Sequence, residues 1–177
     1  MAEVYWGSTQ IKGIKPPGIS FIPFYSGGAY RLYVEVPAGT TALENDAFRR
    51  CGSLFSITIP SSVTSLGTYC FRDCSSLTSV TIPSSVTSLP NYCFYNCSSL
   101  PSITIPSSVT SLGSNCFYGC SNLTKVYFAG NPPSSLSPSA FKNLTLTIYH
   151  KADNSNWTSS IKTSTYGGAT SVTWSTY

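Results

Sequence analysis

ITIPSSVTSLGTYCFRDCSSLTS, residues 57–79, is followed without a gap by VTIPSSVTSLPNYCFYNCSSLPS, residues 80–102, and by ITIPSSVTSLGSNCFYGCSNLTK, residues 103–125. The three segments repeat with a period of 23, and their apolar positions align without an insertion. A fixed period of this length is typical of a solenoid, because one short unit cannot bury its own apolar face and is covered only by stacking on its neighbours. The sequence therefore predicts a stack of repeating turns.

Weaker copies of the unit flank the three regular ones. One copy precedes them at residues 34–51, and another follows at residues 126–141 with one residue inserted before its Ala-Phe pair. A last strand-like piece, residues 146–148, begins at a spacing of 20 from Val126 instead of 23. We therefore expect an array of about five turns with atypical ends.

Each unit contains one short stretch in which apolar and polar residues alternate. Val80, Thr81 and Ile82 show this period of two, which predicts a strand that exposes the middle side chain. Pro83 follows at once, and because proline has no N–H to donate, it ends the strand. The remaining apolar positions are three or four residues apart, which predicts an irregular and loosely helical return segment.

The unit L-x-x-I-x-I-P, followed in the outer copies by an Ala-Phe pair and then by a Cys or its equivalent, resembles the BspA-like, or type 5, leucine-rich repeats of bacterial and protist surface proteins. The resemblance covers about residues 30–150, and spacing, Pro, Phe and Cys all agree. It implies a right-handed leucine-rich-repeat solenoid of the α/β type. Such a fold has one short parallel strand per turn, mostly irregular return segments and β-rich caps at both ends.

One position departs from the repeats that this sequence resembles, and another departs from the commoner leucine-rich repeats. Three cysteines stand where the family usually has Ala: Cys70, Cys93 and Cys116. Three serines replace the Asn ladder of the commoner leucine-rich repeats: Ser62, Ser85 and Ser108. At that bend we expect Ser hydroxyls and main-chain bonds to satisfy the backbone polar groups.

The seven cysteines form two columns at the repeat period. One column holds Cys70, Cys93 and Cys116, and the other holds Cys51, Cys74, Cys97 and Cys120. Their spacing within a unit is C-x-x-x-C, whereas zinc sites typically use C-x-x-C pairs. We expect buried, reduced thiols that pack as small apolar groups. Disulfides between turns and a metal site between turns are the less favoured alternatives, and no metal or other cofactor is predicted.

Residues suited to catalysis are scarce. Only 9% of the residues are charged, and the single histidine, His150, lies at the end of the array, where we expect a solvent-exposed loop residue. Glu44 and Asp46 are the one close pair of acids, and acids in a capping turn are usually just solvated. The sequence contains no G-x-S-x-G elbow and no complete phosphate-binding loop. It predicts no catalytic residue and a protein that is not an enzyme.

Charge and hydropathy also limit the partners. The formal net charge of +4 comes from ten Lys and Arg residues that are scattered along the chain, whereas nucleic-acid binding requires a concentrated basic face. No window approaches the roughly 18 apolar residues of a membrane span. The first residues, MAEVYWG, lack the basic and apolar regions of a secretory signal. As written, the sequence predicts no nucleic-acid binding, no membrane insertion and no export by a signal peptide.

The informative variation between units lies in the turn around C-F-x-x-C. One column holds Arg49, Arg72, Tyr95 and Tyr118, and another holds Asp46, Tyr69, Tyr92 and Asn115. Tyr and Arg are the residues most enriched at binding hot spots. Six residues therefore form the predicted ligand-binding site: Arg49, Tyr69, Arg72, Tyr92, Tyr95 and Tyr118. The alternative is that these side chains merely cover the stacked edge and one another. The Ser and Thr residues of the strands form a flatter and weaker candidate surface.

The two ends differ from the array at residues 30–148. Residues 1–29 contain two alternating runs punctuated by Gly-Ser-Thr, which predict a small β-hairpin that caps or attaches the array. The stretch V-Y-x-G-S-T-x-I resembles short β-segments of bacteriophage tail and appendage proteins. Residues 149–177 resemble the C-terminal cap of BspA-like arrays. Three aromatic residues are expected to seal the open core there: Trp157, Tyr166 and Trp174.

Two functional hypotheses follow from these features. The first is a non-enzymatic recognition or adhesion module that binds a protein or glycan at a cell or particle surface, as the adhesive roles of BspA-like proteins imply. The second is a structural or host-recognition component of a bacteriophage virion, such as a decoration or a tail appendage. In the second case residues 1–29 would form a homo-oligomer or drive virion assembly.

Overall fold

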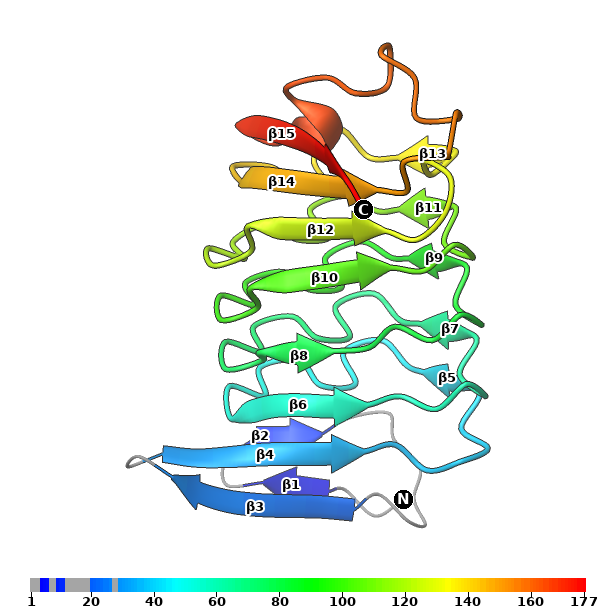
Figure 1. The fold of residues 1–177 in the computed structure, drawn as a ribbon. Coiled ribbons are helices and arrows are strands. Elements are labelled where there is room, and N and C mark those ends of the chain that lie inside the picture. The colour runs from blue at the N-terminus through cyan, green and yellow to red at the C-terminus, as the bar shows by residue number, and fades with distance from the viewer. Residues whose placement is uncertain (1–3, 7–8, 12–19, 27–28) are drawn as a thin grey trace.

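The chain forms a parallel β-solenoid of about six turns of about 23 residues in a computed structural model (Figure 1). The structure describes residues 4–6, 9–11, 20–26 and 29–177. The predicted repeat solenoid is confirmed, with one turn more than the five expected. Within the described part of the chain, no helix is long and apolar enough to cross a membrane.

The alternating stretch of each unit forms the first column of strands, in which neighbours are parallel. Ile57 pairs with Val80 and Ile103 with Val126, so the register equals the repeat period. β4, β6 and β8 belong to one sheet, and β10, β12, β14 and β15 belong to another. The strands are β4 (Ala29–Glu35), β6 (Leu54–Thr58), β8 (Ser79–Val80), β10 (Ser102–Ile105), β12 (Lys125–Phe128), β14 (Thr145–His150) and β15 (Ser171–Thr176).

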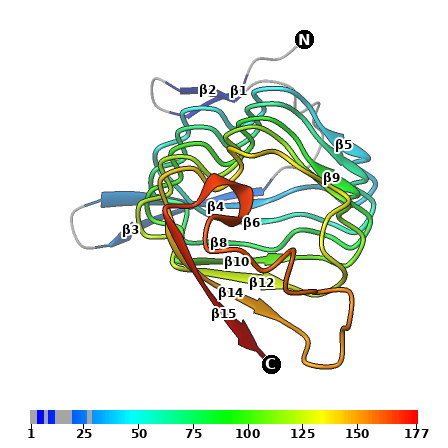
Figure 2. The same cartoon turned by 90° about the horizontal axis from the view of Figure 1, so that it is seen from above.

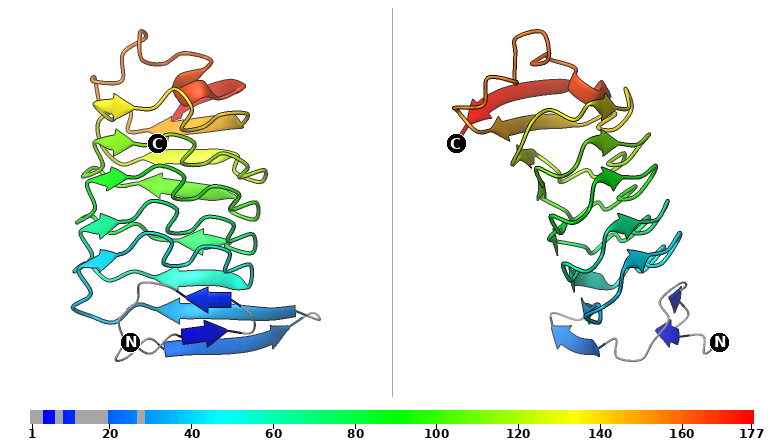
Figure 3. Two further views of the ribbon diagram at one scale, coloured as in Figure 1. Left: turned by 180° about the vertical axis from the view of Figure 1, so that it is seen from behind. Right: turned by 90° about the vertical axis from the view of Figure 1, so that its right-hand side faces the viewer.

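A second column of two-residue strands lies on another face of the solenoid (Figure 3, left). It consists of β5 (Ala42–Leu43), β7 (Ser65–Leu66), β9 (Ser88–Leu89), β11 (Ser111–Leu112) and β13 (Ser135–Leu136). The expectation of one strand per turn and a loosely helical return is wrong in this respect. The three-residue spacings belong to hydrogen-bonded turns, such as the one closed by the Val86 N–H and the Pro83 carbonyl at 3.1 Å. Among the described residues the one helix is the 3₁₀ segment η1 (Tyr166–Gly168).

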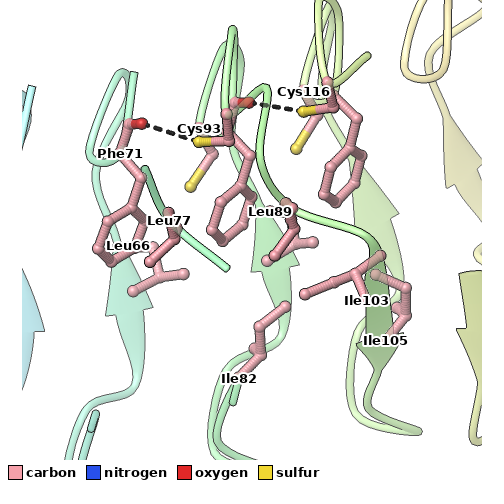
Figure 4. Close-up of a cluster of buried hydrophobic side chains, with 14 of the residues drawn as sticks. Leu66, Phe71, Leu77, Ile82, Leu89, Cys93, Ile103, Ile105 and Cys116 are labelled. Atoms are coloured by element: carbon pink, nitrogen blue, oxygen red, sulfur yellow. Dashed lines mark hydrogen bonds between the residues drawn. The ribbon is translucent and has the colours of Figure 1, made fainter. Parts of the chain in front are cut away.

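Phenylalanines form a continuous ladder through the core. Successive rings stack with centroids 5.2 to 5.4 Å apart and with 2 to 10° between their planes. The ladder consists of Phe48, Phe71, Phe94, Phe117 and Phe141, and all five are fully buried. Aliphatic side chains such as Leu89 and Ile103 pack beside the rings (Figure 4). The core is therefore one continuous stack that joins all turns of the array.

All seven cysteines are buried and free, so their predicted burial is confirmed. In three turns the thiol donates a hydrogen bond of 3.0 to 3.1 Å to a Phe carbonyl of the preceding turn. The pairs are Cys74 with Phe48, Cys97 with Phe71, and Cys120 with Phe94. Burial raises the pKa of Cys51 and Cys120 to about 12, and it raises the pKa of the other five thiols as well. The thiols are therefore protonated at neutral pH.

The serine column satisfies backbone groups at the bend after each strand, as predicted. The Ser108 hydroxyl donates to the carbonyl of Val86 at 2.7 Å, and Ser85 makes the equivalent bond one turn earlier. Ser62 instead accepts a bond of 3.2 Å from the N–H of Gly39. Hydroxyls thus take the place that an Asn ladder has in other repeats.

Two antiparallel pairs of strands form at the N-terminal end. β1 (Val4–Trp6) pairs with β2 (Thr9–Ile11), and β3 (Ser20–Ser26) pairs with β4. The sequence predicted one small hairpin here, whereas the two alternating runs form separate pairings. β4 is antiparallel to β3 on one side and parallel to β6 on the other, so it joins the N-terminal segment to the array. The remainder of the segment before β4 lies outside the described ranges.

The C-terminal segment covers the other end of the core (Figure 2). Trp157 and Tyr166 are buried, and their ring centroids lie 5.0 and 6.2 Å from that of Phe128. Trp174 packs against both at 5.7 and 5.3 Å. These contacts confirm that the three aromatic residues seal the core.

His150 is buried, so the expectation of a solvent-exposed loop residue is wrong. Its side chain is only 4% exposed and stacks on Trp157 at 5.4 Å, and its Nδ1 lies 2.9 Å from the carbonyl oxygen of Lys151. His150 ends β14, and the alternation of that strand turns it toward the core together with Ile148. β14 also corrects the expected register, because Ile148, and not Leu146, is the residue that pairs with Val126.

Candidate functional site

The turn around C-F-x-x-C is held in place by the turn that follows it. The N–H groups of Tyr92, Phe94 and Asn96 donate to carbonyls of the next turn at 2.8 to 2.9 Å. Equivalent bonds of 2.8 to 3.3 Å recur one turn earlier. Alternate N–H groups must face the neighbouring turn to make these bonds. The backbone conformation is therefore set by the stacking of turns more than by the local residue type.

One position of this turn has a left-handed backbone in four successive units. The φ angle is 61° at Asp46, 62° at Tyr69, 57° at Tyr92 and 52° at Asn115. Asp and Asn tolerate this region, whereas bulky residues rarely adopt it. The left-handed conformation costs a residue with a side chain about 1–2 kcal/mol. Local backbone preference therefore explains Asp46 and Asn115, and it does not explain Tyr69 and Tyr92.

Tyrosine rings stack along this edge of the solenoid. Tyr69 and Tyr92 stack with centroids 5.0 Å apart, and Tyr95 and Tyr118 stack at 5.2 Å. Tyr92 and Tyr95, tilted by 55° at 5.7 Å, join the two stacks into one ladder. An aromatic pair contributes about 0.5–1.5 kcal/mol beyond its buried area, which is of the same order as the backbone strain.

Two arginines pack on the rings at the N-terminal end of the ladder. The Arg72 guanidinium carbon lies 5.3 Å from the centroid of Tyr69 and 4.9 Å from that of Tyr95. The Arg49 guanidinium carbon lies 5.5 Å from the centroid of Tyr69. These distances are within the range of cation–π attraction. Arg72 thus bridges the two columns of the ladder.

Each of these arginines is also paired with a carboxylate. Arg49 contacts Asp46 at 3.0 Å, and Arg72 contacts Asp73 at 3.3 Å. The side chains of both pairs are 27 to 33% exposed, so each pair contributes only about 0–1 kcal/mol to stability. Asn96 donates a further bond of 2.9 Å to Asp73. The carboxylates of Asp46 and Asp73 therefore neutralise the positive charges of the two arginines locally.

The structure brings all six predicted site residues together. They form one continuous, half-buried patch, which we name the tyrosine–arginine edge: Arg49, Tyr69, Arg72, Tyr92, Tyr95 and Tyr118. Ligand binding at this edge stays a prediction. The alternative, mutual cover, accounts for the ring faces that contact one another. Stacking also offsets the backbone strain of Tyr69 and Tyr92, whereas Asp46 and Asn115 in the flanking turns avoid that strain altogether.

Other surfaces carry less chemistry. The strand face of the central turns presents only exposed hydroxyls: Ser79, Thr81, Ser102 and Thr104. Asp46, one of the two acids considered as a pair, is bound to Arg49. In the described ranges, no group of three or more His, Cys, Asp and Glu side chains is placed to hold a metal ion.

A second aromatic cluster was not predicted from the sequence. Tyr127 and Tyr149 stack at 4.6 Å, and Tyr177 meets Tyr127 edge-on at 6.0 Å. The spacing from Tyr127 to Tyr149 is one short of the repeat period, and the expected register therefore missed the pair. Once Ile148 is aligned with Val126, Tyr127 and Tyr149 occupy equivalent outward positions in neighbouring strands, and this alignment predicts the pair.

Comparison with protein families identifies the type of the repeat. The model of the BspA type leucine-rich repeat region matches residues 32–171 in six copies. The number of copies agrees with the about six turns of the structure. No curated protein matches the chain.

Solved structures of similar architecture come from several bacteria. A leucine-rich cell surface protein from Faecalibacterium prausnitzii A2-165 is 27% identical with a TM-score of 0.58, and the match covers 77% of this chain and 39% of that one. A leucine-rich repeat protein from Bacteroides capillosus ATCC 29799 is 25% identical with a TM-score of 0.53, over 66% of this chain and 98% of that one. The leucine-rich repeat protein of T. pallidum is 22% identical with a TM-score of 0.61, over 73% and 68%, and this likeness concerns the fold alone. The match thus spans well under half of the Faecalibacterium protein.

Proposed function

The chain belongs to the family of BspA-type leucine-rich repeat proteins, and from this premise we propose that it is a non-enzymatic recognition module that binds a ligand at a cell or particle surface. The ligand is held by the tyrosine–arginine edge. Repeat solenoids of this kind present long regular surfaces for binding. The similar protein from Faecalibacterium prausnitzii is itself described as a cell surface protein.

The observation that carries the proposal is the left-handed backbone of Tyr69 and Tyr92. The same column uses Asp46 and Asn115 in the turns on either side, so residues that suit this backbone are available to the repeat. Strained residues that persist on a surface point to a function that needs their side chains. Tyr supplies the large and partly polar contact area that binding hot spots use.

The packing of the edge also favours binding. Each Tyr ring is held by at least one other ring, and Tyr69 and Tyr95 each lie beside Arg72. Side chains that are already ordered lose little conformational entropy when a ligand arrives. The edge is thus preorganised, whereas a patch of free side chains would lose about 0.5–1.5 kcal/mol per residue on binding.

A non-enzymatic role is supported by the state of the reactive groups. The buried thiols have raised pKa values and are protonated at neutral pH, so they are poor nucleophiles. Asp46 and Asp73 are engaged with arginines. His150 is packed inside the C-terminal cap.

The test compares two triple variants in binding to cultured epithelial cells, intact bacterial cells and printed glycans. Y92N/Y95S/Y118S removes three rings and places at residue 92 an Asn, which suits the left-handed backbone. A hot-spot residue contributes at least about 2 kcal/mol, so if the three losses add, binding should fall by about 10⁴-fold. The control T58A/T81A/T104A alters three exposed Thr residues of the strand face and should bind as the unchanged protein does. Equal binding by Y92N/Y95S/Y118S and the unchanged protein would show that the edge is not the site.

A structural component of a bacteriophage particle is the second candidate. The pairing of β1 with β2 supports this candidate, because both strands belong to the stretch of sequence that resembles phage β-segments. Deletion of residues 1–29 should then abolish a defined oligomer and leave the array folded, as measured by light scattering and circular dichroism. If the protein is monomeric with and without these residues, the assembly role is wrong.

A further inference from the structure

The central turns of the solenoid carry no charge. The sequence has no Asp, Glu, Lys, Arg or His between Asp73 and Lys125. The tyrosine–arginine edge crosses these turns at Tyr92, Tyr95 and Tyr118. At its N-terminal end Arg49 and Arg72 are neutralised by their own carboxylates, and Arg50, the next residue after Arg49, is exposed. An acidic ligand therefore finds little electrostatic attraction along most of the edge.

The same surface lacks apolar anchors. Among the described residues, Tyr177 is the one exposed large hydrophobic side chain, and it lies at the C-terminal end. Protein interfaces usually bury an apolar centre that excludes water. Without exposed aliphatic groups on the central turns, the edge offers only its tyrosine and arginine side chains to such a centre.

What remains on the edge is polar and neutral. Within the described part of the chain, the hydroxyls of the four edge tyrosines make no hydrogen bond, and none is among the buried atoms without a partner: Tyr69, Tyr92, Tyr95 and Tyr118. With respect to the described residues, these hydroxyls are therefore available to bond to a ligand. The side chains of Asn91 and Ser114 in the same turns are already engaged, because the Ser114 N–H donates to Asn91 Oδ1 at 2.7 Å and the Ser114 hydroxyl bonds that of Ser137 at 3.2 Å. The Asn115 amide lies in the tyrosine column and adds to the phenols. Phenol, amide and hydroxyl groups match a ligand that is itself covered with hydroxyls and has no charge.

We infer that the tyrosine–arginine edge binds an uncharged glycan whose chain runs along the solenoid axis. This inference rests on the proposed function and names the ligand class of the same site. Turns stack about 4.8 Å apart, so the edge from Arg49 to Tyr118 spans three intervals, or about 14 Å. A polysaccharide chain can contact several rungs at once, and the repeated weak contacts then add up.

The test is affinity gel electrophoresis of the full chain in gels that contain one polysaccharide each. The neutral probes are hydroxyethyl cellulose, mannan, soluble starch and β-1,3-glucan, and the acidic probes are polygalacturonate and heparin. The protein should be retarded by at least one neutral probe and by neither acidic probe. Because no charge takes part, the retardation should be the same at about 0.05 M and about 0.5 M NaCl, although the Debye length shrinks about threefold.

Two variants link the retardation to the edge. Y95F/Y118F keeps both stacked rings and removes two hydroxyls, so the fold is preserved and affinity should fall about 10-fold with the loss of two hydrogen bonds. The strand-face control T58A/T81A/T104A should be retarded as the unchanged protein is. Melting curves of the variants verify that each is folded.

The outcomes separate the ligand class from the site. Retardation by the acidic probes alone, or retardation that disappears at high salt, overturns the uncharged glycan. So does the absence of retardation in all four neutral gels. If the protein binds cells and Y92N/Y95S/Y118S abolishes that binding while no neutral gel retards it, the proposed recognition role survives with a protein ligand. If Y95F/Y118F and Y92N/Y95S/Y118S are retarded as the unchanged protein is, both the ligand class and the site at the edge are wrong.

Discussion

The first turn of the array and the two turns after it share a backbone and differ in chemistry. At the left-handed position the first turn has Asp46, which suits that conformation, whereas the next two have Tyr69 and Tyr92. The φ angles of the three residues agree within 5°. A solenoid thus separates two tasks. Stacking determines the backbone, and the side chains on the edge are free to follow function.

The core shows a similar division between central and outer turns. The central turns place Cys70, Cys93 and Cys116 before the core Phe, and the outer turns place Ala47 and Ala140 there. All five side chains are fully buried. Burial of an ionisable thiol where the outer turns bury a methyl group makes the central turns sensitive to alkali.

The largest expected effect is the loss of stability at high pH. An unfolded thiol ionises near its ordinary pKa of 9.0, whereas burial raises the pKa of Cys51 and Cys120 to about 12 in the folded protein. Above pH 9 the unfolded chain loses protons that the folded chain keeps, so the free energy of unfolding falls as the pH rises. At pH 10, one unit above the unfolded pKa, Cys51 and Cys120 each remove roughly 1 kcal/mol. The pKa of the other five thiols is raised in the same direction, so the summed loss is a large part of the about 5–15 kcal/mol stability of a typical domain. Urea unfolding at pH 8, 9 and 10 measures this loss.

The control for the alkaline effect copies the outer turns. C70A/C93A/C116A replaces three thiols by the Ala that residues 47 and 140 already carry. The variant should lose about three sevenths of the pH dependence of its unfolding free energy. A slope equal to that of the unchanged protein would show that these thiols are not the groups that titrate.

The next effect concerns the phenylalanine ladder. Phe94 stacks on Phe71 at 5.2 Å and on Phe117 at 5.4 Å, whereas Phe141 has one Phe neighbour, at 5.3 Å. Phe94→Ala should lower the free energy of unfolding by about 3–5 kcal/mol. Phe141→Ala should cost about 1 kcal/mol less, because one stacked pair is lost instead of two. Urea unfolding at neutral pH measures both, and equal losses would mean that stacking does not distinguish the centre from the end.

What the sequence could predict is what recurs at a constant spacing. The strand alternation at Val80 and Ile82, the two cysteine columns and the six edge residues all follow the repeat period. Residues at equal positions of a stacked unit must lie side by side, so their proximity follows from the period alone. The edge could therefore be located without coordinates.

The rest depends on interactions that no single unit contains. Two-residue strands such as β9 (Ser88–Leu89) exist because the neighbouring turns pair with them, and their own sequence is too short to show a period. His150 is buried by the alternation of β14 and by Trp157, both at the irregular end. The left-handed backbone of Tyr69 and Tyr92 is imposed by bonds between turns, and residue type alone would have predicted the opposite.

The smallest expected effect tests the backbone strain on which the proposed function rests. Tyr92→Asn and Tyr92→Ala both remove the contacts with Tyr69 and Tyr95, so the two variants differ mainly in how well residue 92 tolerates a φ of 57°. Because Asn suits this backbone better than Ala, the Asn variant should be more stable by about 1 kcal/mol. Urea unfolding of both variants measures the difference.

Asn115 provides the matched control for this comparison, since it has a φ of 52° in the same column and is not one of the stacked rings. Asn115→Ala should therefore cost the same about 1 kcal/mol that separates the two variants at residue 92. If the stability difference between Asn and Ala is the same at residues 92 and 115, both positions impose the same backbone strain. Tyr92 then incurs this strain and Asn115 avoids it. If Ala and Asn were equally stable at both positions, the tyrosines would be unstrained. Their presence at the edge would then need no functional explanation.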